Sequence, residues 1–187
     1  MAANQGEWPI KQGFVSIGWD RMGDLSSLPE TRDAFKALFL EKYPEDKKGA
    51  IPVKAGVLFR FANEIKAGDI IIYPSKTDRM VNIGTVEGGY LYSPDEMEER
   101  THRRKVRWLK HIPRSDFSQN SLNEIGSAVT LFQVSNNAEE FLNALEGIPT
   151  ELTDQDDTVA LLLHQETTQN PWEVQRRKVC LTRQLAV

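Results

Sequence analysis

A run of basic residues between positions 100 and 114 is the strongest chemical signal in this sequence of 187 residues. Seven arginines and lysines and two histidines lie there, and no acidic residue separates them. Cations at this density would follow a phosphate backbone, with an affinity that falls as salt rises. The alternative is an ordinary solvated strand face. The residues that we expect to contact phosphate are Arg103, Arg104, Lys105, Arg107, Lys110 and Arg114, together with Arg79 from an earlier loop.

A second set of residues has the chemistry to hold a planar heterocycle. Trp19 lies in a loop between Gly18 and Gly23, away from any apolar period, so core burial is not its obvious role. A flat aromatic side chain is what a flipped or single-stranded base stacks on, worth roughly 1–3 kcal/mol per base. The alternatives are core packing for the rings and an ordinary polar hairpin for the loop at 75–79. The residues that we expect to bind a base are Trp19, Asp20, Tyr73, Ser75, Lys76, Tyr90 and Tyr92.

Motifs for catalysis or metal binding are scarce. Glu64 and Lys66 have the E-x-K spacing of nucleases in which acids hold Mg²⁺ and a lysine assists the attacking water. The turn at Gly68-Asp69 explains this stretch as well. His102 and His111 do not have ligand spacing, and the sequence holds no phosphate loop, HExxH or nucleophile elbow. We therefore expect no catalytic residue, no metal and no cofactor, with a nuclease using Glu64 and Lys66 as an alternative.

The elements that would position these residues are mostly strands. Alternating or β-branched apolar residues predict strands in the following ranges: 11–17, 56–61, 70–73, 81–86, 90–92, 102–112 and 128–134. The run at 70–73 has no polar alternation, so we expect it to be covered on both faces. Gly84 indicates a bulge or a close approach, and Gly88-Gly89 a turn. In the strand at 102–112, Val106 and Trp108 share one face, which predicts that Trp108 packs in the core.

Helix signals are fewer and lie between the strands. Ser27 and Glu30 have the spacing of a capping box, which predicts a helix from there to Pro44. Ser121 predicts a short helical turn that ends at Gly126, and Asn137 predicts a helix that ends at Gly147. Five or six strands with few helices predict an α+β fold, namely a small curved mixed sheet or barrel with flanking helices.

Composition divides the chain into two parts. Of 27 acidic and 23 basic residues, nine acids and four bases lie in residues 136–187, which leaves 18 acids and 19 bases in residues 1–135. We therefore expect a base-recognition domain over 1–135, followed by a short helix, an acidic linker and a tail over 136–187. No run of eighteen apolar residues is present, and Cys180 is the only cysteine. Cytoplasmic residence without a membrane partner is therefore the expectation.

The order of several motifs resembles a known fold. A strand leads into the Trp19 loop and then a helix. Other matching segments are Glu64–Asp69, Val81–Val86, and Arg104–Leu109 before Ile112-Pro113. This arrangement resembles the PUA-like fold, and within it the EVE and YTH groups that read modified bases. Gly18-Trp19-Asp20 with Gly23–Ser26, Tyr73–Lys76 and His102–Leu109 are similar to the N-terminal domain of Mrr-type restriction endonucleases.

The resemblance implies a DNA-binding reader of a restriction system, which accommodates a modified, typically methylated, base flipped from duplex DNA. Such readers are normally joined to a nuclease domain. About thirty residues follow the acidic linker, too few for that domain, so we expect either a fragment of a longer nuclease or a module that acts with a partner nuclease domain or subunit. Two further alternatives are an RNA-binding PUA-like module that reads single strands and a protein-interaction adaptor that works through the acidic tail.

Overall fold

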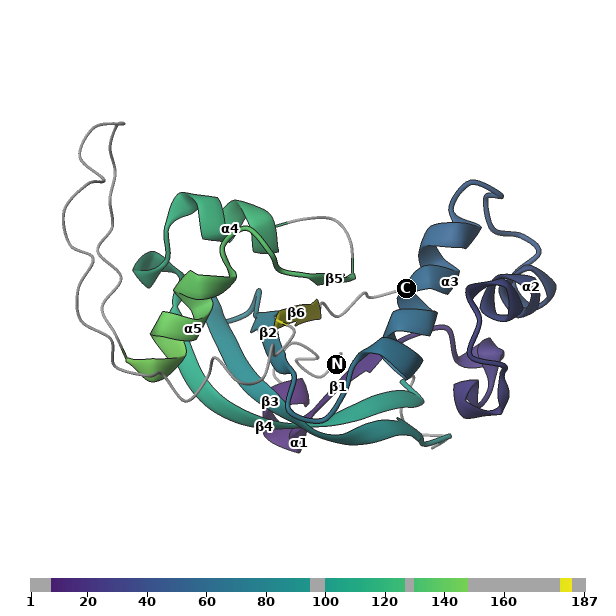
Figure 1. Ribbon diagram of the computed structural model, residues 1–187, viewed down its shortest axis with the longest axis horizontal. Coiled ribbons are helices and arrows are strands. Elements are labelled where there is room, and N and C mark those ends of the chain that lie inside the picture. Colours follow the sequence, from purple (N-terminus) through teal and green to yellow (C-terminus); the bar gives the residue numbers. More distant parts are fainter. Residues whose placement is uncertain (1–7, 95–99, 127–129, 148–178, 183–187) are drawn as a thin grey trace, which may run out of the picture.

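The computed structural model describes residues 8–94, 100–126, 130–147 and 179–182. Within these ranges it contains a six-stranded sheet of order β1-β4-β3-β2-β6-β5. Neighbouring strands are antiparallel except for β2 and β6, which are parallel. The long strands β3 and β4 curve beneath the helices (Figure 1), which confirms the predicted curved mixed sheet. The strands are β1 (Phe14–Ile17), β2 (Ile70–Pro74), β3 (Met80–Tyr92), β4 (His102–Pro113), β5 (Leu131–Gln133) and β6 (Val179–Thr182).

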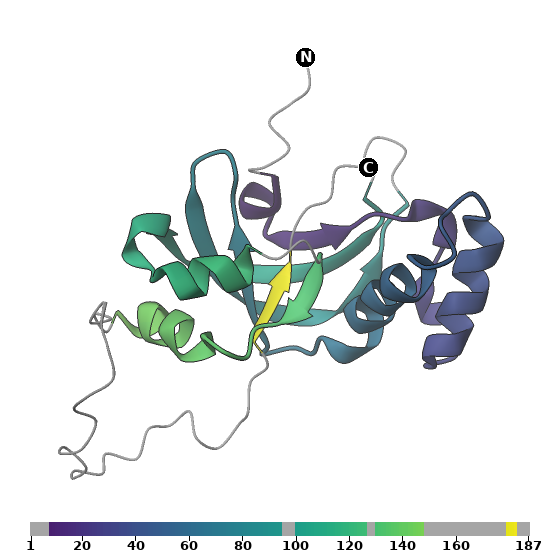
Figure 2. The same ribbon diagram turned by 90° about the horizontal axis from the view of Figure 1, so that it is seen from above.

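Helices lie at both ends of this sheet. The helix pair α2 and α3 lies at one end and the pair α4 and α5 at the other, with β5 and β6 between them (Figures 1 and 2). No helix among the described residues is long and apolar enough to cross a membrane. The helices are α1 (Trp8–Gln12), α2 (Arg32–Lys42), α3 (Ile51–Phe59), which continues as a π-helical turn (Arg60–Glu64), α4 (Gln119–Ile125) and α5 (Ala138–Glu146). Short 3₁₀ turns cover Asp20–Met22, Leu25–Ser27 and Arg114–Asp116.

The predicted strand at 56–61 is wrong, because this segment is helical. It belongs to α3 and the π-helical turn after it. The consecutive residues Val57 and Leu58 are both buried, which a strand with one buried face does not allow. Pro52 occupies the first turn of α3, where its missing N–H breaks no helical hydrogen bond. The segment is therefore a buried helix whose apolar residues face several neighbours.

Other boundaries also differ from the prediction. Helix α2 begins after Thr31, whose hydroxyl accepts a hydrogen bond from the N–H of Ala34 at 3.3 Å, so the predicted cap at Ser27 is wrong. Helix α4 is capped by Ser118 rather than by Ser121. Strand β3 runs through the glycine pair at 88–89 instead of turning there. The predicted strand segments at 11–12 and 128–129 lie in α1 and outside the described residues, respectively.

Two apolar clusters pack on opposite faces of β2. Ile71 belongs to the cluster formed with β1, α2 and α3, whereas Ile70 and Ile72 belong to the cluster formed with α4 and α5. All five residues of β2 are buried, which confirms that this strand is covered on both faces. Phe141 of α5 is fully buried in the second cluster. The sheet thus packs against the pair α2 and α3 through one apolar cluster and against the pair α4 and α5 through the other.

Gly84 lies at an irregularity in the pairing of β3 with β4, as the sequence predicted. The register shifts between Ile83 and Gly84. A Cβ atom at this position would lie 2.6 Å from a methyl carbon of Val106 and 2.9 Å from the indole of Trp108. Only glycine leaves room for the indole of Trp108 at this position.

Candidate nucleic-acid interface

Trp19 is held in a loop at the end of β1 and packs partly against the core. Its backbone is left-handed, with φ of 72°. The half-buried indole meets the ring of Phe39 edge-on, with ring centroids 6.4 Å apart. The backbone carbonyl oxygen of Trp19 lies 3.2 Å from Nε2 of His102 on β4. One part of the indole is therefore committed to the core, and the remainder is open to solvent.

The expected base-binding residues Asp20, Tyr90 and Tyr92 lie near Trp19, and each of them contacts either Thr101 or His102. Asp20 Oδ1 accepts hydrogen bonds from the N–H and the hydroxyl of Thr101 at 3.0 and 2.8 Å. The hydroxyl of Tyr90 lies 2.7 Å from Nδ1 of His102, and the ring of Tyr92 lies 5.9 Å from the same imidazole. His102 is fully buried, which lowers its pKa. These groups bind the Trp19 loop to β4.

Tyr73 lies in a different part of the sheet. It is 4% exposed, and its ring packs on Trp108 with centroids 6.1 Å apart, whereas Trp19 packs on Phe39. Burial raises the pKa of Tyr73 to about 12. Ser75 is buried beside Tyr73, and Lys76 is exposed. The expected base-binding residues therefore form two separate groups rather than one shared aromatic wall.

Arg104 does not have the position that we expected for a phosphate contact. The residue is 2% exposed, and its guanidinium donates hydrogen bonds to the carbonyl oxygens of Phe61 at 2.6 Å, Ala62 at 2.8 Å and Gly88 at 3.3 Å. It joins the end of the α3 segment to β3. Because a buried guanidinium that donates to three backbone carbonyls cannot reach a ligand, Arg104 is a structural residue, and the prediction that it contacts phosphate is wrong.

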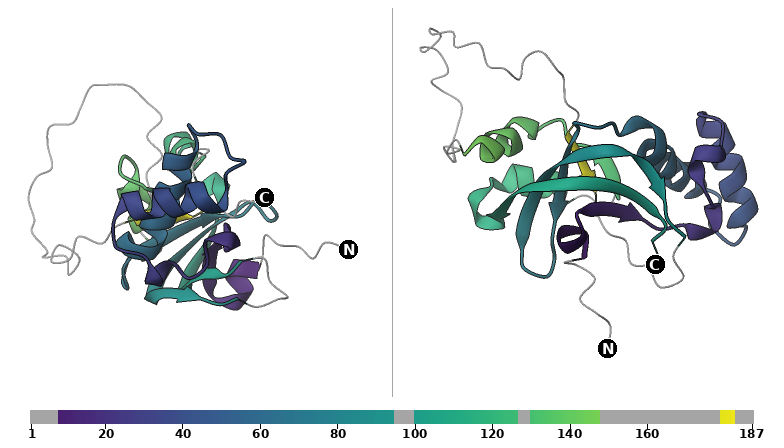
Figure 3. Two further views of the ribbon diagram at one scale, coloured as in Figure 1. Left: turned by 90° about the vertical axis from the view of Figure 1, so that its right-hand side faces the viewer. Right: turned by 90° about the horizontal axis from the view of Figure 1, so that it is seen from below.

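The neighbouring basic residues of β4 alternate with Arg104 and face outward. Lys105 and Arg107 are exposed. In the view from below, the long strands β3 and β4 run across the front of the molecule (Figure 3). Glu87 on β3 lies 3.3 Å from the amine of Lys105 and 3.5 Å from Nε of Arg107. Such exposed ion pairs are weak. The row of exposed cations on β4 therefore keeps a net positive charge, although the fold places the acidic side chain of Glu87 beside it.

Two other basic residues of the predicted set lie at the ends of this row. The guanidinium of Arg103 lies 4.9 Å from the ring of Phe14, and its Nε donates to the carbonyl of Arg100 at 2.9 Å. Lys110 is exposed and pairs in register with Ile83. Both are at the surface, so they can supply charge to an anionic partner.

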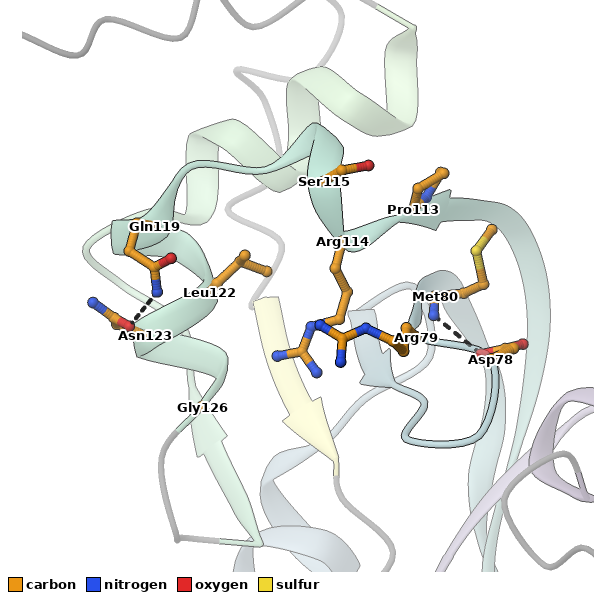
Figure 4. Close-up of a pocket in the computed structure, with 10 residues that line it drawn as sticks. All are labelled: Asp78, Arg79, Met80, Pro113, Arg114, Ser115, Gln119, Leu122, Asn123 and Gly126. Carbon is orange, nitrogen blue, oxygen red and sulfur yellow. Dashed lines mark hydrogen bonds between the residues drawn. The ribbon is translucent and has the colours of Figure 1, made fainter.

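The last two predicted phosphate contacts, Arg79 and Arg114, converge in a groove at the far end of β3 and β4. Pairing of Met80 with Pro113 brings their two segments together, and the N–H of Arg114 donates to the carbonyl of Arg79 at 3.3 Å. Both side chains point into the same cavity (Figure 4). We call this cavity of about 780 Å³ the arginine groove; it is lined by Asp78, Arg79, Met80, Pro113, Arg114, Ser115, Gln119, Leu122, Asn123 and Gly126.

The electrostatics of the arginine groove favour an anion. Among the described residues, no acidic side chain lies within ion-pair distance of either guanidinium. The carboxylate of Asp78 points away from them and accepts a hydrogen bond from the N–H of Met80 at 3.0 Å (Figure 4). Two planar guanidinium groups present paired N–H donors, which match the oxygens of a phosphate or carboxylate.

Sequence reasoning missed the part of the groove that α4 supplies. Gln119 and Asn123 are one helical turn apart on α4, and the side-chain amide of Gln119 donates a hydrogen bond to Asn123 Oδ1 at 2.7 Å. Leu122 points from the same helix toward the arginines (Figure 4). These are ordinary residues of a short amphipathic helix. Only the fold of the chain after Pro113, where a 3₁₀ turn redirects it, places them opposite Arg79.

The E-x-K stretch has structural contacts instead of a metal-binding arrangement. Glu64 accepts a hydrogen bond from Arg32 at 2.6 Å, and the N–H of Lys66 donates to Asp69 at 2.8 Å. Within the described ranges, no group of three potential ligands among histidine, cysteine and acidic residues could hold a metal ion. The carboxylate of Glu64 and the backbone N–H of Lys66 therefore have partners within the protein.

The chain was compared with known families and proteins. The model of the family described as a domain of unknown function, DUF8426, matches residues 2–135. The chain therefore belongs to this family. Searches of curated proteins and of solved structures found no significant match.

Proposed function

We propose that this member of the DUF8426 family is a non-catalytic nucleic-acid-binding module that holds the sugar-phosphate backbone in the arginine groove. The observation that carries the proposal is the convergence of Arg79 and Arg114 in one cavity without an acidic partner among the described residues. Backbone phosphates supply most of the affinity in such complexes. The exposed cations Lys105 and Arg107 would extend the contact along the strand.

We further propose that the nucleic acid is DNA carrying a modified base. The support is the order of motifs that resembles modified-base readers, together with the half-exposed indole of Trp19. In this proposal a partner nuclease acts on the bound DNA, and the module works in the cytoplasm. A methyl group on the base would contribute selectivity of about 1–3 kcal/mol by filling an apolar site.

The backbone contact is tested by removing the two groove charges. In the Arg79→Gln/Arg114→Gln variant, loss of two charged hydrogen bonds at about 1.5 kcal/mol each predicts roughly hundredfold weaker binding of a labelled oligonucleotide. The matched control is Lys47→Gln/Lys48→Gln, which removes two exposed charges from the segment between α2 and α3. Fluorescence anisotropy at low salt measures both. Equal losses in the two variants would contradict the proposal.

The modified-base part requires a separate comparison. The wild-type chain is titrated with methylated duplex DNA, the same duplex without methylation, and a single-stranded RNA of equal length. Tighter binding of the methylated duplex is expected. Equal affinity for the two duplexes would remove the modified-base claim, and preference for RNA would favour a single-strand RNA-binding module.

A further inference from the structure

Part of the lining of the arginine groove is apolar. Leu122 points from α4 toward the two guanidinium groups, and Met80 and Pro113 line the cavity on the strand side (Figure 4). Leu122 is partly buried and packs against the second apolar cluster, so its position is supported from behind. An apolar surface beside the arginines contributes little to binding a phosphate, which water solvates, whereas it can contact the face of a base.

The size of the groove supports the same conclusion. Its volume of about 780 Å³ lies within the range of roughly 300–1,000 Å³ that is typical of small-molecule sites. A single phosphate would leave most of this space to water. A guanidinium can also bind phosphate through its N–H edge while a base lies on its face.

We infer that the arginine groove holds a whole nucleotide, with its phosphate on Arg79 and Arg114 and its base against Leu122. This inference rests on the proposed backbone contact, and the nucleotide that it places at α4 is separate from the modified base proposed for the Trp19 loop. The ligand class is a nucleotide whose base is unstacked, either in a single strand or flipped out of a duplex. Gln119 also lines the groove, and its amide donates to Asn123, so in this inference its amide oxygen is the group that meets the polar edge of the base.

The test compares two oligonucleotides of the same length and charge, one with normal bases and one made entirely of abasic sites. Anisotropy titrations with the full chain at low salt give both affinities. The normal strand is expected to bind about tenfold more tightly, because burying roughly 50 Å² of base surface has that effect on a binding constant. Leu122→Ala should abolish the preference. Leu142→Ala, a partly buried leucine of α5 in the same cluster, is the matched control and should retain it.

Crosslinking provides a second measurement that needs no variant. An oligonucleotide with one diazirine-labelled base is bound, irradiated and mapped by mass spectrometry. Adducts in residues 113–126 support the inference, and adducts confined to residues 18–24 overturn it. Equal binding of normal and abasic strands also overturns it but leaves the proposed backbone contact intact. Failure of both strands to bind at low salt overturns the proposed function itself.

Discussion

Replacing Arg104 tests whether the basic run of β4 divides into structural and surface residues. Its guanidinium donates to the carbonyls of Phe61 and Ala62 at 2.6 and 2.8 Å, with a longer bond to Gly88. The first two carbonyls lie in the π-helical turn after α3. In the Arg104→Met variant the aliphatic stem is retained, but these buried carbonyls lose their donor.

The expected loss of stability follows from these contacts. A hydrogen bond to a charged group contributes about 1.5–3 kcal/mol, and the cost of burying the charge offsets part of this gain. Two short bonds therefore predict a decrease of about 3 kcal/mol in the free energy of unfolding. For a chain of this size that corresponds to a fall in Tm of roughly 6–12 °C.

Urea-induced unfolding followed by tryptophan fluorescence measures the change. The control is Arg107→Met, which removes an exposed guanidinium at 3.5 Å from Glu87 and should change stability by less than about 0.5 kcal/mol. A loss below about 1 kcal/mol for Arg104→Met, or equal losses in the two variants, would refute the structural assignment of Arg104.

Three further predictions concern stability and pH. Gly84→Ala should destabilise the fold by about 1–3 kcal/mol in urea unfolding, because its Cβ would overlap Val106 and Trp108; an unchanged midpoint would contradict this reasoning. Burial lowers the pKa of His102, so its contribution to stability is complete above the unfolded pKa of about 6.5 and is lost as pH falls toward the folded pKa. Tm should therefore decrease from pH 7.5 to 5.5, and by less in His102→Gln. Although partial burial acts to raise it, the pKa of Glu124 is lowered by hydrogen bonds from the backbone after β5, so its stabilisation is present above about pH 4.3 and is lost in stronger acid. Glu124→Gln should cost about 1 kcal/mol at pH 7, and a difference from wild type that persists undiminished at pH 3 would contradict the account.

The strands with unambiguous patterns were predictable from the sequence. Strand β2 has a continuous β-branched run between Gly68 and Pro74, which favours a doubly covered strand, and β4 alternates basic and apolar residues over Lys105–Trp108. In contrast, Val57, Leu58 and Phe61 are compatible with either period, because a fully buried helix has no polar face to mark it. The choice between Ser27 and Thr31 as a cap depends on where the preceding 3₁₀ turns leave the chain, which local spacing does not determine.

The candidate site was predictable in its chemistry but not in its arrangement. Composition identified Arg79 and Arg114 as cations suited to phosphate, and no local feature indicated that they meet. Their convergence depends on the pairing of Met80 with Pro113, which is a property of strand register. Likewise, the burial of Arg104 follows from its contacts with the π-helical turn after α3, and the local sequence pattern there predicts a strand.

The salt dependence of oligonucleotide binding tests the central claim most directly. Each phosphate neutralised by the protein contributes about 0.7–0.9 to the slope of log K against log salt concentration. We predict that the slope in Arg79→Gln/Arg114→Gln is shallower than in the wild-type chain by about 1.4–1.8. Identical slopes in the two proteins, or wild-type binding that does not depend on salt, would contradict the claim that this groove holds the nucleic-acid backbone.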